Sequence, residues 1–194
     1  MNKAEVKAYF NHHASDWDKK MIRSQHKIDA ILDAAGVCAG MRVLDVACGT
    51  GVLFEDYLAR GAERIVGVDL SPEMVQIARR KFPQSHITVQ CADIETAQFE
   101  ADFDSCVIYN ALPHFIDPAL LVAHLSAFIK PGGRLCIAHG MSREALTRHH
   151  SGSAMKISKL LPELDALCAM IEPYFHCHTA ISDEEKVIVA GIRR

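Results

Sequence analysis

Apolar segments of strand length alternate with helical patterns through the middle of the chain, and this alternation limits the possible fold more than any other feature. Each segment is short, mostly apolar and bounded by Gly, Pro or Asp, which is typical of strands buried on both faces. Strands that alternate with helices form a parallel sheet. We predict such strands at residues 41–47, 64–68, 86–91, 103–109 and 134–138.

The helices between these strands have recognisable start signals. Ser71 and Asp117 each precede a proline, which places a capping side chain ahead of proline at the first helical position. Met74 belongs to the apolar stripe of the first of these helices. The apolar stripe of the second runs to residue 129, and the Lys-Pro-Gly-Gly sequence at 130–133 is predicted to end it.

The two ends of the chain depart from this alternation. Residues 1–35 predict helices ahead of the first strand, and residues 163–172 predict a last helix. Two β-prone runs, 174–181 and 186–192, are joined by a connection that suits a hairpin and is too short for a parallel crossover. We therefore expect one α/β domain over residues 1–194, with a Rossmann-like, seven-stranded, mostly parallel sheet, helices on both faces and an antiparallel C-terminal hairpin.

Composition restricts the functional classes. The 21 Lys and Arg residues against 24 Asp and Glu residues give a net charge of −3, which disfavours strong electrostatic binding of nucleic acid. We find no signal-peptide pattern and no apolar run long enough to span a bilayer, so we expect a cytoplasmic protein without membrane association. The seven cysteines lack any C-x-x-C pair, and we expect them to be reduced, mostly buried residues that hold no metal.

The loop that follows the first strand, residues 45–51, carries the main chemical signal. Gly49 and Gly51 allow a ligand to approach the backbone closely, although an ordinary tight turn between strand and helix has the same pattern. A dinucleotide fingerprint would need a third glycine where Phe54 stands, and a phosphate-binding P-loop would need a lysine. Asp69 ends the second strand, where a carboxylate can accept hydrogen bonds from ribose hydroxyls.

The order of these motifs resembles that of class I S-adenosylmethionine-dependent methyltransferases, particularly the small enzymes of menaquinone and ubiquinone biosynthesis. Residues 43–51 are similar to the first motif of that family, 68–71 with Met74 to the second, and 91–95 to the third. Residues 103–110 and 125–133 complete the order. Ala47 stands where the family often has glycine, and alanine also occurs in the quinone-type pattern.

The resemblance implies S-adenosyl-L-methionine as the cofactor. Gly49 and Gly51 would pass under its methionine part, and Asp45 would lie near its ammonium group. Asp69 would hold the ribose and Asp93 the adenine amino group. Two of these assignments have alternatives, since Met74 has the spacing of a core residue and Asp93 could cap a turn. The predicted cofactor-binding residues are Tyr9, Asp45, Ala47, Cys48, Gly49, Gly51, Asp69, Leu70, Met74, Asp93, Ile94 and Asn110.

Methyl transfer from a sulfonium is an in-line displacement, and a hydroxyl, acidic carbon or ammonium acceptor also needs a general base. His114 follows the fourth strand, beside the methyl group in the resembled family, and is our candidate catalytic base. A histidine that merely packs under a loop is the alternative. His139, His149 and His150 follow the fifth strand and could bind substrate or a metal, although solvated loop histidines are more common.

Two segments are predicted to cover the site. Residues 1–35 resemble the helical lid of the family, in which Tyr9 and Trp17 could approach the cofactor or serve as packing anchors. Residues 141–161 show no convincing single helix, and we interpret them as a substrate-covering insertion.

The predicted function is therefore methyl transfer to a small-molecule acceptor. Enzymes that methylate amino groups of nucleic-acid bases typically have Asn/Asp-Pro-Pro-Tyr/Phe where residues 110–113 read Asn-Ala-Leu-Pro, which disfavours nucleic-acid substrates. The alternatives are an RNA or protein methyltransferase, a non-catalytic S-adenosylmethionine-binding sensor and, less favoured, a nicotinamide-binding protein. The acceptor atom and the oligomeric state are not predicted.

Overall fold

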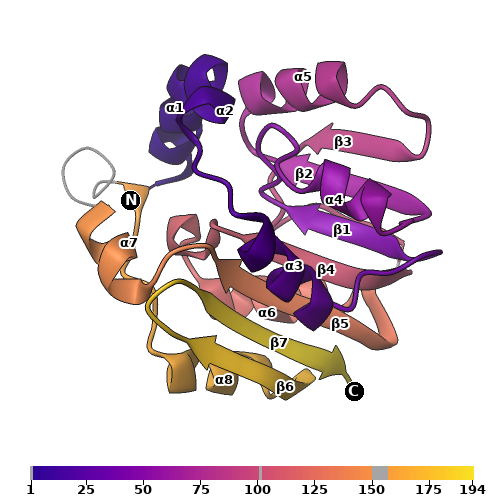
Figure 1. The fold of residues 1–194 in the computed structure, drawn as a ribbon, viewed down its shortest axis with the longest axis vertical. Helices are drawn as coiled ribbons and strands as arrows, with labels where there is room; N and C mark the ends of the chain where they lie inside the picture. The colour runs from indigo at the N-terminus through magenta and orange to yellow at the C-terminus, as the bar shows by residue number, and fades with distance from the viewer. Residues whose placement is uncertain (1, 101, 150–156) are drawn as a thin grey trace.

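One mixed β-sheet organises the residues that the computed structural model describes, which are 2–100, 102–149 and 157–194; within them the sheet has seven strands (Figure 1). The strand order is β3-β2-β1-β4-β5-β7-β6. The first five strands pair in parallel and β7 pairs antiparallel with β5 and β6, so the predicted Rossmann-like sheet and its antiparallel end are confirmed. The strands are β1 (Arg42–Val46), β2 (Arg64–Asp69), β3 (Ile87–Cys91), β4 (Phe103–Tyr109), β5 (Ile129–His139), β6 (Phe175–Ser182) and β7 (Val187–Arg193).

The fifth strand begins earlier than the sequence predicts. Ile129 lies opposite Phe103 of β4, and the backbone N–H of Phe103 donates to the carbonyl oxygen of Phe128 over 3.1 Å. The preceding helix therefore ends at Ser126, and the prediction that its apolar stripe continues to residue 129 is wrong. The Lys-Pro-Gly-Gly sequence lies inside β5, where the register of pairing with β4 shifts.

Both predicted helix starts are present. The Ser71 hydroxyl accepts a hydrogen bond from the Met74 backbone over 3.2 Å, and the Asp117 carboxylate accepts from two backbone N–H groups. One α-helix, Arg143–His149, occupies part of the segment in which we predicted no single helix. The helices are α1 (Lys3–His13), α2 (Trp17–Lys20), α3 (Gln25–Ala34), α4 (Phe54–Ala59), α5 (Pro72–Lys81), α6 (Pro118–Ser126), α7 (Arg143–His149) and α8 (Leu164–Ile171), with short 3₁₀ turns η1 (Ala14–Asp16) and η2 (Leu112–His114).

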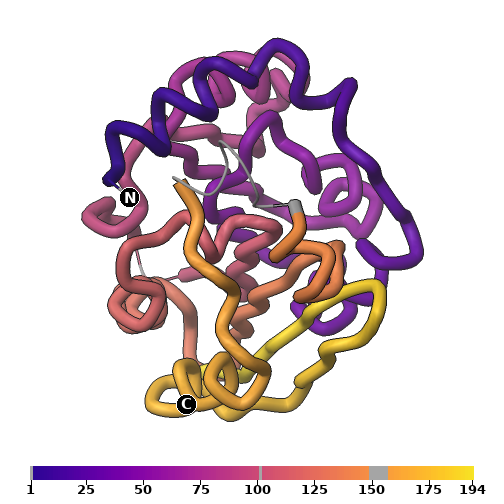
Figure 2. Tube along the Cα trace, turned by 90° about the vertical axis from the view of Figure 1, so that its left-hand side faces the viewer, coloured from indigo at the N-terminus to yellow at the C-terminus, as the bar shows by residue number. Residues whose placement is uncertain are grey.

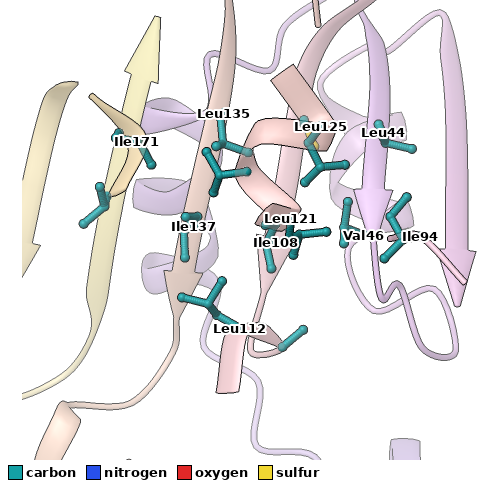
Figure 3. Packing of buried hydrophobic residues seen from close by; sticks show 14 of the residues in the cluster. Leu44, Val46, Ile94, Ile108, Leu112, Leu121, Leu125, Leu135, Ile137 and Ile171 are labelled. Carbon is teal, nitrogen blue, oxygen red and sulfur yellow. The ribbon is translucent and has the colours of Figure 1, made fainter. Parts of the chain in front are cut away.

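Apolar side chains fill both faces of the sheet. On one face, residues of α6 and α8 such as Leu121 and Ile171 pack against Leu44 and Ile137 (Figure 3). On the other face, α3, α4 and α5 cover the same strands. Gly67 of β2 allows a close approach there, because a Cβ atom at this position would lie 2.5 Å from Phe54 of α4. The sheet is therefore packed with apolar side chains on both of its faces.

The edge strands of the sheet each have an irregular or covered backbone. On β3, the Arg79 guanidinium of α5 donates to the carbonyl oxygen of Val89 through Nε at 3.0 Å and Nη2 at 2.7 Å. On β6, the register of pairing shifts between Cys177 and Thr179, which is a β-bulge. Each edge strand thus carries one such feature, a guanidinium bound to the backbone of β3 and a bulge in β6.

The N-terminal helices lie outside the two layers that cover the sheet. Helices α1 and α2 with η1 pack beside α5, and Figure 2 shows this indigo segment running along one rim of the molecule. A short linker, residues 21–24, joins them to α3, which packs against the sheet. The segment 3–20, which we call the lid segment, is therefore joined to α3 by this linker and packs beside α5.

The cysteines are less uniformly buried than we expected. All seven are free thiols, but Cys38 and Cys91 are exposed and only Cys48, Cys106 and Cys136 are buried. Among the described residues, no helix is long and apolar enough to cross a membrane.

Candidate functional site

A cavity of about 520 Å³ opens at the carboxyl ends of the parallel strands. Its walls come from the loops that follow β1 to β5 and from the lid segment, and its centre lies where the strand order reverses between β1 and β4. Open α/β sheets bind ligands at such a switch point. Twelve of the thirteen predicted site residues line it; these are Tyr9, Asp45, Ala47, Cys48, Gly49, Asp69, Leu70, Met74, Asp93, Ile94, Asn110 and His114.

The loop after β1 has an unusual backbone. Ala47, Gly49 and Gly51 have positive φ angles of 55°, 56° and 80°. Ala47 adopts this left-handed conformation despite its Cβ atom, which is costly for an L-residue. Gly51 is the one predicted residue that does not line the cavity: a Cβ atom there would lie 2.8 Å from the Phe82 ring, so its glycine serves close packing.

Asp69 fixes the geometry of that loop. Its carboxylate accepts hydrogen bonds from the backbone N–H of Gly49 and of Ser71, both over 2.8 Å. Burial raises the pKa of Asp69, and these backbone donors oppose the rise because they favour the charged form. A carboxylate at the end of β2 is thus held beside the cavity with two of its acceptor positions occupied.

Asp45 is the most deeply buried carboxylate of the site, with 2% of its surface exposed. Burial raises its pKa to about 8; the nearby Tyr57 hydroxyl opposes the rise, and the charge of Asp69 adds to it. The Tyr57 hydroxyl lies near Asp45, but among the described residues it has no partner at normal hydrogen-bond distance and angle. A cationic ligand group that enters the cavity would therefore favour the ionised form of Asp45.

The far end of the cavity is acidic and is tied to the lid segment. Asp93 accepts from the Glu95 backbone over 3.1 Å and from Lys3 Nζ over 2.5 Å, and Lys3 also lies 2.5 Å from the Glu95 carboxylate. Asp93 therefore caps a turn and also lines the cavity. Met74, with 1% of its surface exposed, is likewise both a core residue and a wall residue.

His114 lies on the opposite side, after β4. Its Nδ1 is 2.9 Å from the carbonyl oxygen of Ile157 and 3.2 Å from the Ser158 hydroxyl. A carbonyl oxygen only accepts, so Nδ1 carries the hydrogen in the neutral ring and the lone pair is on Nε2. The His114 ring also stands edge-on to Phe10 of the lid segment, with ring centroids 5.0 Å apart.

Asn110 has a structural reason for its position beside His114. Its φ is 54°, and its side-chain oxygen accepts from the Gly140 backbone over 2.9 Å, which joins the ends of β4 and β5. The strained backbone turns the chain sharply out of the sheet and into the cavity wall.

Comparison with known proteins agrees with this geometry. Residues 44–137 match a family model described as "Methyltransferase domain". The chain is 38% identical over 104 residues to the ubiquinone biosynthesis O-methyltransferase of Xylella fastidiosa (strain 9a5c), covering 52% of this chain and 42% of that protein. The chain contains a methyltransferase domain over residues 44–137, and its relatives and its fold support a class I S-adenosylmethionine-dependent methyltransferase. It thus spans less than half the length of that curated relative.

Solved structures share the fold at low sequence identity. A methyltransferase solved in complex with the Haloferax volcanii Trm112 activator has a TM-score of 0.81 at 20% identity, over 95% of this chain and 97% of that one. Magnesium protoporphyrin IX methyltransferase from Synechocystis PCC 6803, solved with bound SAH, has a TM-score of 0.73 at 19% identity, over 99% of both chains. These similarities establish the class I architecture of the sheet.

One of the three histidines predicted to follow the fifth strand differs from our expectation. His139 ends β5 with 1% of its surface exposed, so it is a buried residue and not a solvated loop histidine. His149 ends α7, but its side chain, like all of His150, lies outside the described residues. Within the described ranges, no group of three or more His, Cys, Asp or Glu side chains could hold a metal ion.

Segments on two sides cover the cavity. Met141 and Leu146 line it from the predicted insertion, of which residues 150–156 lie outside the described structure. From the lid segment, Tyr9 and Trp17 line it and both pack against the Phe10 ring, at centroid distances of 5.4 and 5.5 Å. Tyr9 and Trp17 therefore both line the cavity and pack within the lid segment.

Sequence reasoning missed Lys3 and Glu95, which also line the cavity. Glu95 was visible as a second acidic residue beside Asp93. Lys3 offered no signal, because it pairs with Asp93, which is far from it in the sequence.

Proposed function

We propose that the protein transfers a methyl group from S-adenosyl-L-methionine to a small-molecule acceptor. The observation that carries this proposal is one cavity at the switch point of the sheet, walled by Asp45, Asp69 and Asp93 at the ends of three neighbouring strands. The match of residues 44–137 to a methyltransferase domain supports the same cofactor.

The residues present fit that cofactor. Gly49 lines the cavity, and a Cβ atom there would project toward the Trp17 indole nitrogen, 3.9 Å away, so the missing side chain leaves room over the loop. Two carboxylates with raised pKa values, the buried Asp45 and the partly exposed Asp69, suit a ligand with an ammonium group and hydroxyl donors. Ile94 and Met74 offer apolar walls beside the acceptor oxygens of Asp93, as an aminopurine ring requires.

The bound cofactor supplies an electrophilic methyl group on a sulfonium sulfur, which the acceptor atom attacks in line. The protein's own contribution is to orient the two molecules and to exclude water with the lid segment and the segment after β5. Where the acceptor must lose a proton, we assign its removal to His114, whose Nδ1–H faces the Ile157 carbonyl oxygen and leaves Nε2 as the basic atom.

A small acceptor is favoured over a macromolecule for two reasons. The net charge of −3 provides no broad basic surface for RNA. The acceptor side of the cavity, between the lid segment and α7, is walled by apolar and aromatic side chains that include Phe10, Phe115, Met141 and Leu146. The cytoplasmic location and the single-domain organisation predicted from the sequence stay predictions.

Calorimetry with S-adenosylhomocysteine tests the cofactor proposal. The wild-type chain is expected to bind it, and Asp69→Ala is expected to weaken binding roughly 100-fold because two charge-assisted interactions are lost. Asp165→Ala, an exposed acidic residue on α8, is the matched control and should bind as the wild type does. Absence of binding by the wild-type chain would refute the proposal.

Methyl transfer into a cell extract tests the acceptor class. With a labelled methyl donor, label is expected in the low-molecular-weight fraction, and His114→Ala should reduce the rate of labelling. Label recovered in RNA or protein would instead support the macromolecular alternatives. Binding without any label transfer would support a sensor.

A further inference from the structure

Two residues of the lid segment lie directly on the cofactor loop. The Trp17 indole nitrogen is the nearest atom to the position of a Cβ on Gly49. The next residue, Asp18, accepts a hydrogen bond from the Thr50 hydroxyl over 2.5 Å. Thr50 stands between Gly49 and Gly51 and is fully buried. The lid segment therefore contacts the loop at its one hydroxyl-bearing residue.

The same carboxylate reaches a third element. The second oxygen of Asp18 accepts from Lys81 Nζ over 2.8 Å, at the end of α5. Lys81 lies 5.5 Å from the centroid of the Phe82 ring, and Phe82 is the ring that leaves no room for a side chain at Gly51. Asp18 thus joins the lid segment, the loop and the helix that supports the loop.

The docked position of the lid segment depends on few buried groups. Within residues 3–20, all of which are described, the buried apolar residues are Val6 and Ala14. Further contacts lie at the rim of the cavity: the edge-on pair of Phe10 with His114, the hydrogen bond from the Ser71 hydroxyl to Asn11 over 2.6 Å, and the ion pair of Lys3 with Asp93. A segment held in this way can undock at modest cost.

We propose that Asp18 is a positioning residue which couples docking of the lid segment to the binding conformation of the loop at residues 47–51. This proposal rests on the cofactor site proposed above. In the docked state Asp18 satisfies the buried Thr50 hydroxyl and helps to hold Gly49 and Gly51 at their positive φ angles. Cofactor binding and lid docking then stabilise each other, because a ligand that prefers one of two states shifts the population toward it.

The chain provides its own reporter of docking. Trp17 is the sole tryptophan in the sequence, so its fluorescence and its quenching by acrylamide report on the segment that carries Asp18. Four variants complete the design: Asp18→Ala, Thr50→Val, the double variant, and Thr50→Ser, which keeps the hydroxyl. Asp16→Ala is the matched control, because the ion pairs of Asp16 in the described structure join it to exposed Lys19 and Lys20 of the same segment.

Both single variants are expected to weaken S-adenosylhomocysteine binding about 10-fold, the order expected when a charge-assisted hydrogen bond is lost at a partly exposed site. The double variant should be no weaker than the weaker single variant, because both substitutions remove the same interaction. Trp17 should be quenched more readily in both variants without ligand, and saturating ligand should restore protection. Thr50→Ser and Asp16→Ala should match the wild type in both measurements.

Two results would overturn the coupling. One is additive losses in the double variant; the other is wild-type affinity with wild-type quenching in both single variants. Either result, with a wild-type chain that binds the ligand, would leave the proposed function intact. A wild-type chain that does not bind S-adenosylhomocysteine would overturn the proposed function and the coupling with it. Melting temperatures of all variants separate these outcomes from loss of folding.

Discussion

Binding of S-adenosylhomocysteine is expected to strengthen about tenfold for each pH unit between pH 6 and pH 8. The reason is the buried carboxyl group of Asp45, whose pKa burial raises to about 8. To pair with the ligand's ammonium group, Asp45 must be ionised. Below its pKa most of the unliganded protein holds this group neutral, and the binding reaction must release the proton.

The size of the effect follows from the pKa. At two units below the pKa, ionising Asp45 costs about 2.7 kcal/mol, since each unit corresponds to about 1.36 kcal/mol. The affinity at pH 6 should therefore be roughly 100-fold below its plateau, which it reaches above pH 8. The Asp45→Asn variant has no ionisable group at this position, so this contribution to the change of affinity with pH is absent. It should bind more weakly than the wild type at pH 8, because it lacks the charge pair, and should differ little at pH 6.

Isothermal titration calorimetry measures both the affinity and the number of protons released on binding. In two buffers that differ in ionisation enthalpy, the wild-type chain at pH 6 should release close to one proton on binding, and at pH 9 almost none. Asp69 also has a raised pKa, so Asp45→Asn retains whatever smaller slope Asp69 contributes. A wild-type affinity that does not change from pH 6 to pH 8, or an equal slope in Asp45→Asn, would refute the reasoning.

Three further predictions concern the same loop. Between about pH 4 and pH 8 the folded chain holds a proton on Asp45 that the unfolded chain does not. The protonated Asp45 therefore contributes fully to the free energy of unfolding below about pH 4, and this contribution is lost as the pH rises to about 8. Denaturant titrations should show the decline in the wild type and a flatter profile in Asp45→Asn. Tyr57→Phe removes a donor that lowers the pKa of Asp45 and should shift the pH profile of ligand binding upward, and an unchanged profile would mean that the hydroxyl does not act on Asp45. Gly51→Ala should lower the free energy of unfolding, measured by urea titration, by at least about 2 kcal/mol. The reason is that the φ angle is 80° and that the new Cβ would lie 2.8 Å from Phe82 and 2.9 Å from Phe54. A loss below about 0.5 kcal/mol would contradict the packing argument.

The sheet could be predicted because its signals are local. Buried parallel strands appear as short apolar runs, and Ser71 and Asp117 mark helix starts through bonds to backbone only a few residues away. The β5 boundary could not be predicted in this way. Its start is decided by pairing of Ile129 with Phe103 on a distant strand, and this pairing overrides a helical spacing that looked continuous.

The same distinction applies to the site. Carboxylates that end strands, such as Asp45 and Asp69, could be predicted because parallel strands bring their ends together. The contacts of the lid segment could not, since they depend on how α1 and α2 settle beside α5. Lys3 at the acidic end of the cavity and Asp18 on Thr50 are the results of that tertiary docking. The burial of His139 was missed for a related reason: His139 pairs with Val187 of β7, a strand far along the chain.

The two margins of the sheet also affect how this chain behaves at high concentration. An edge strand with free backbone groups is a template on which another chain can add a strand, and long assemblies can grow from such pairing. On β3 the Arg79 guanidinium occupies the carbonyl oxygen of Val89, and on β6 the bulge at Cys177 breaks the even spacing that an incoming strand would need. Both ends of the sheet are therefore poor templates, which protects this α/β protein from aggregating through its own edges.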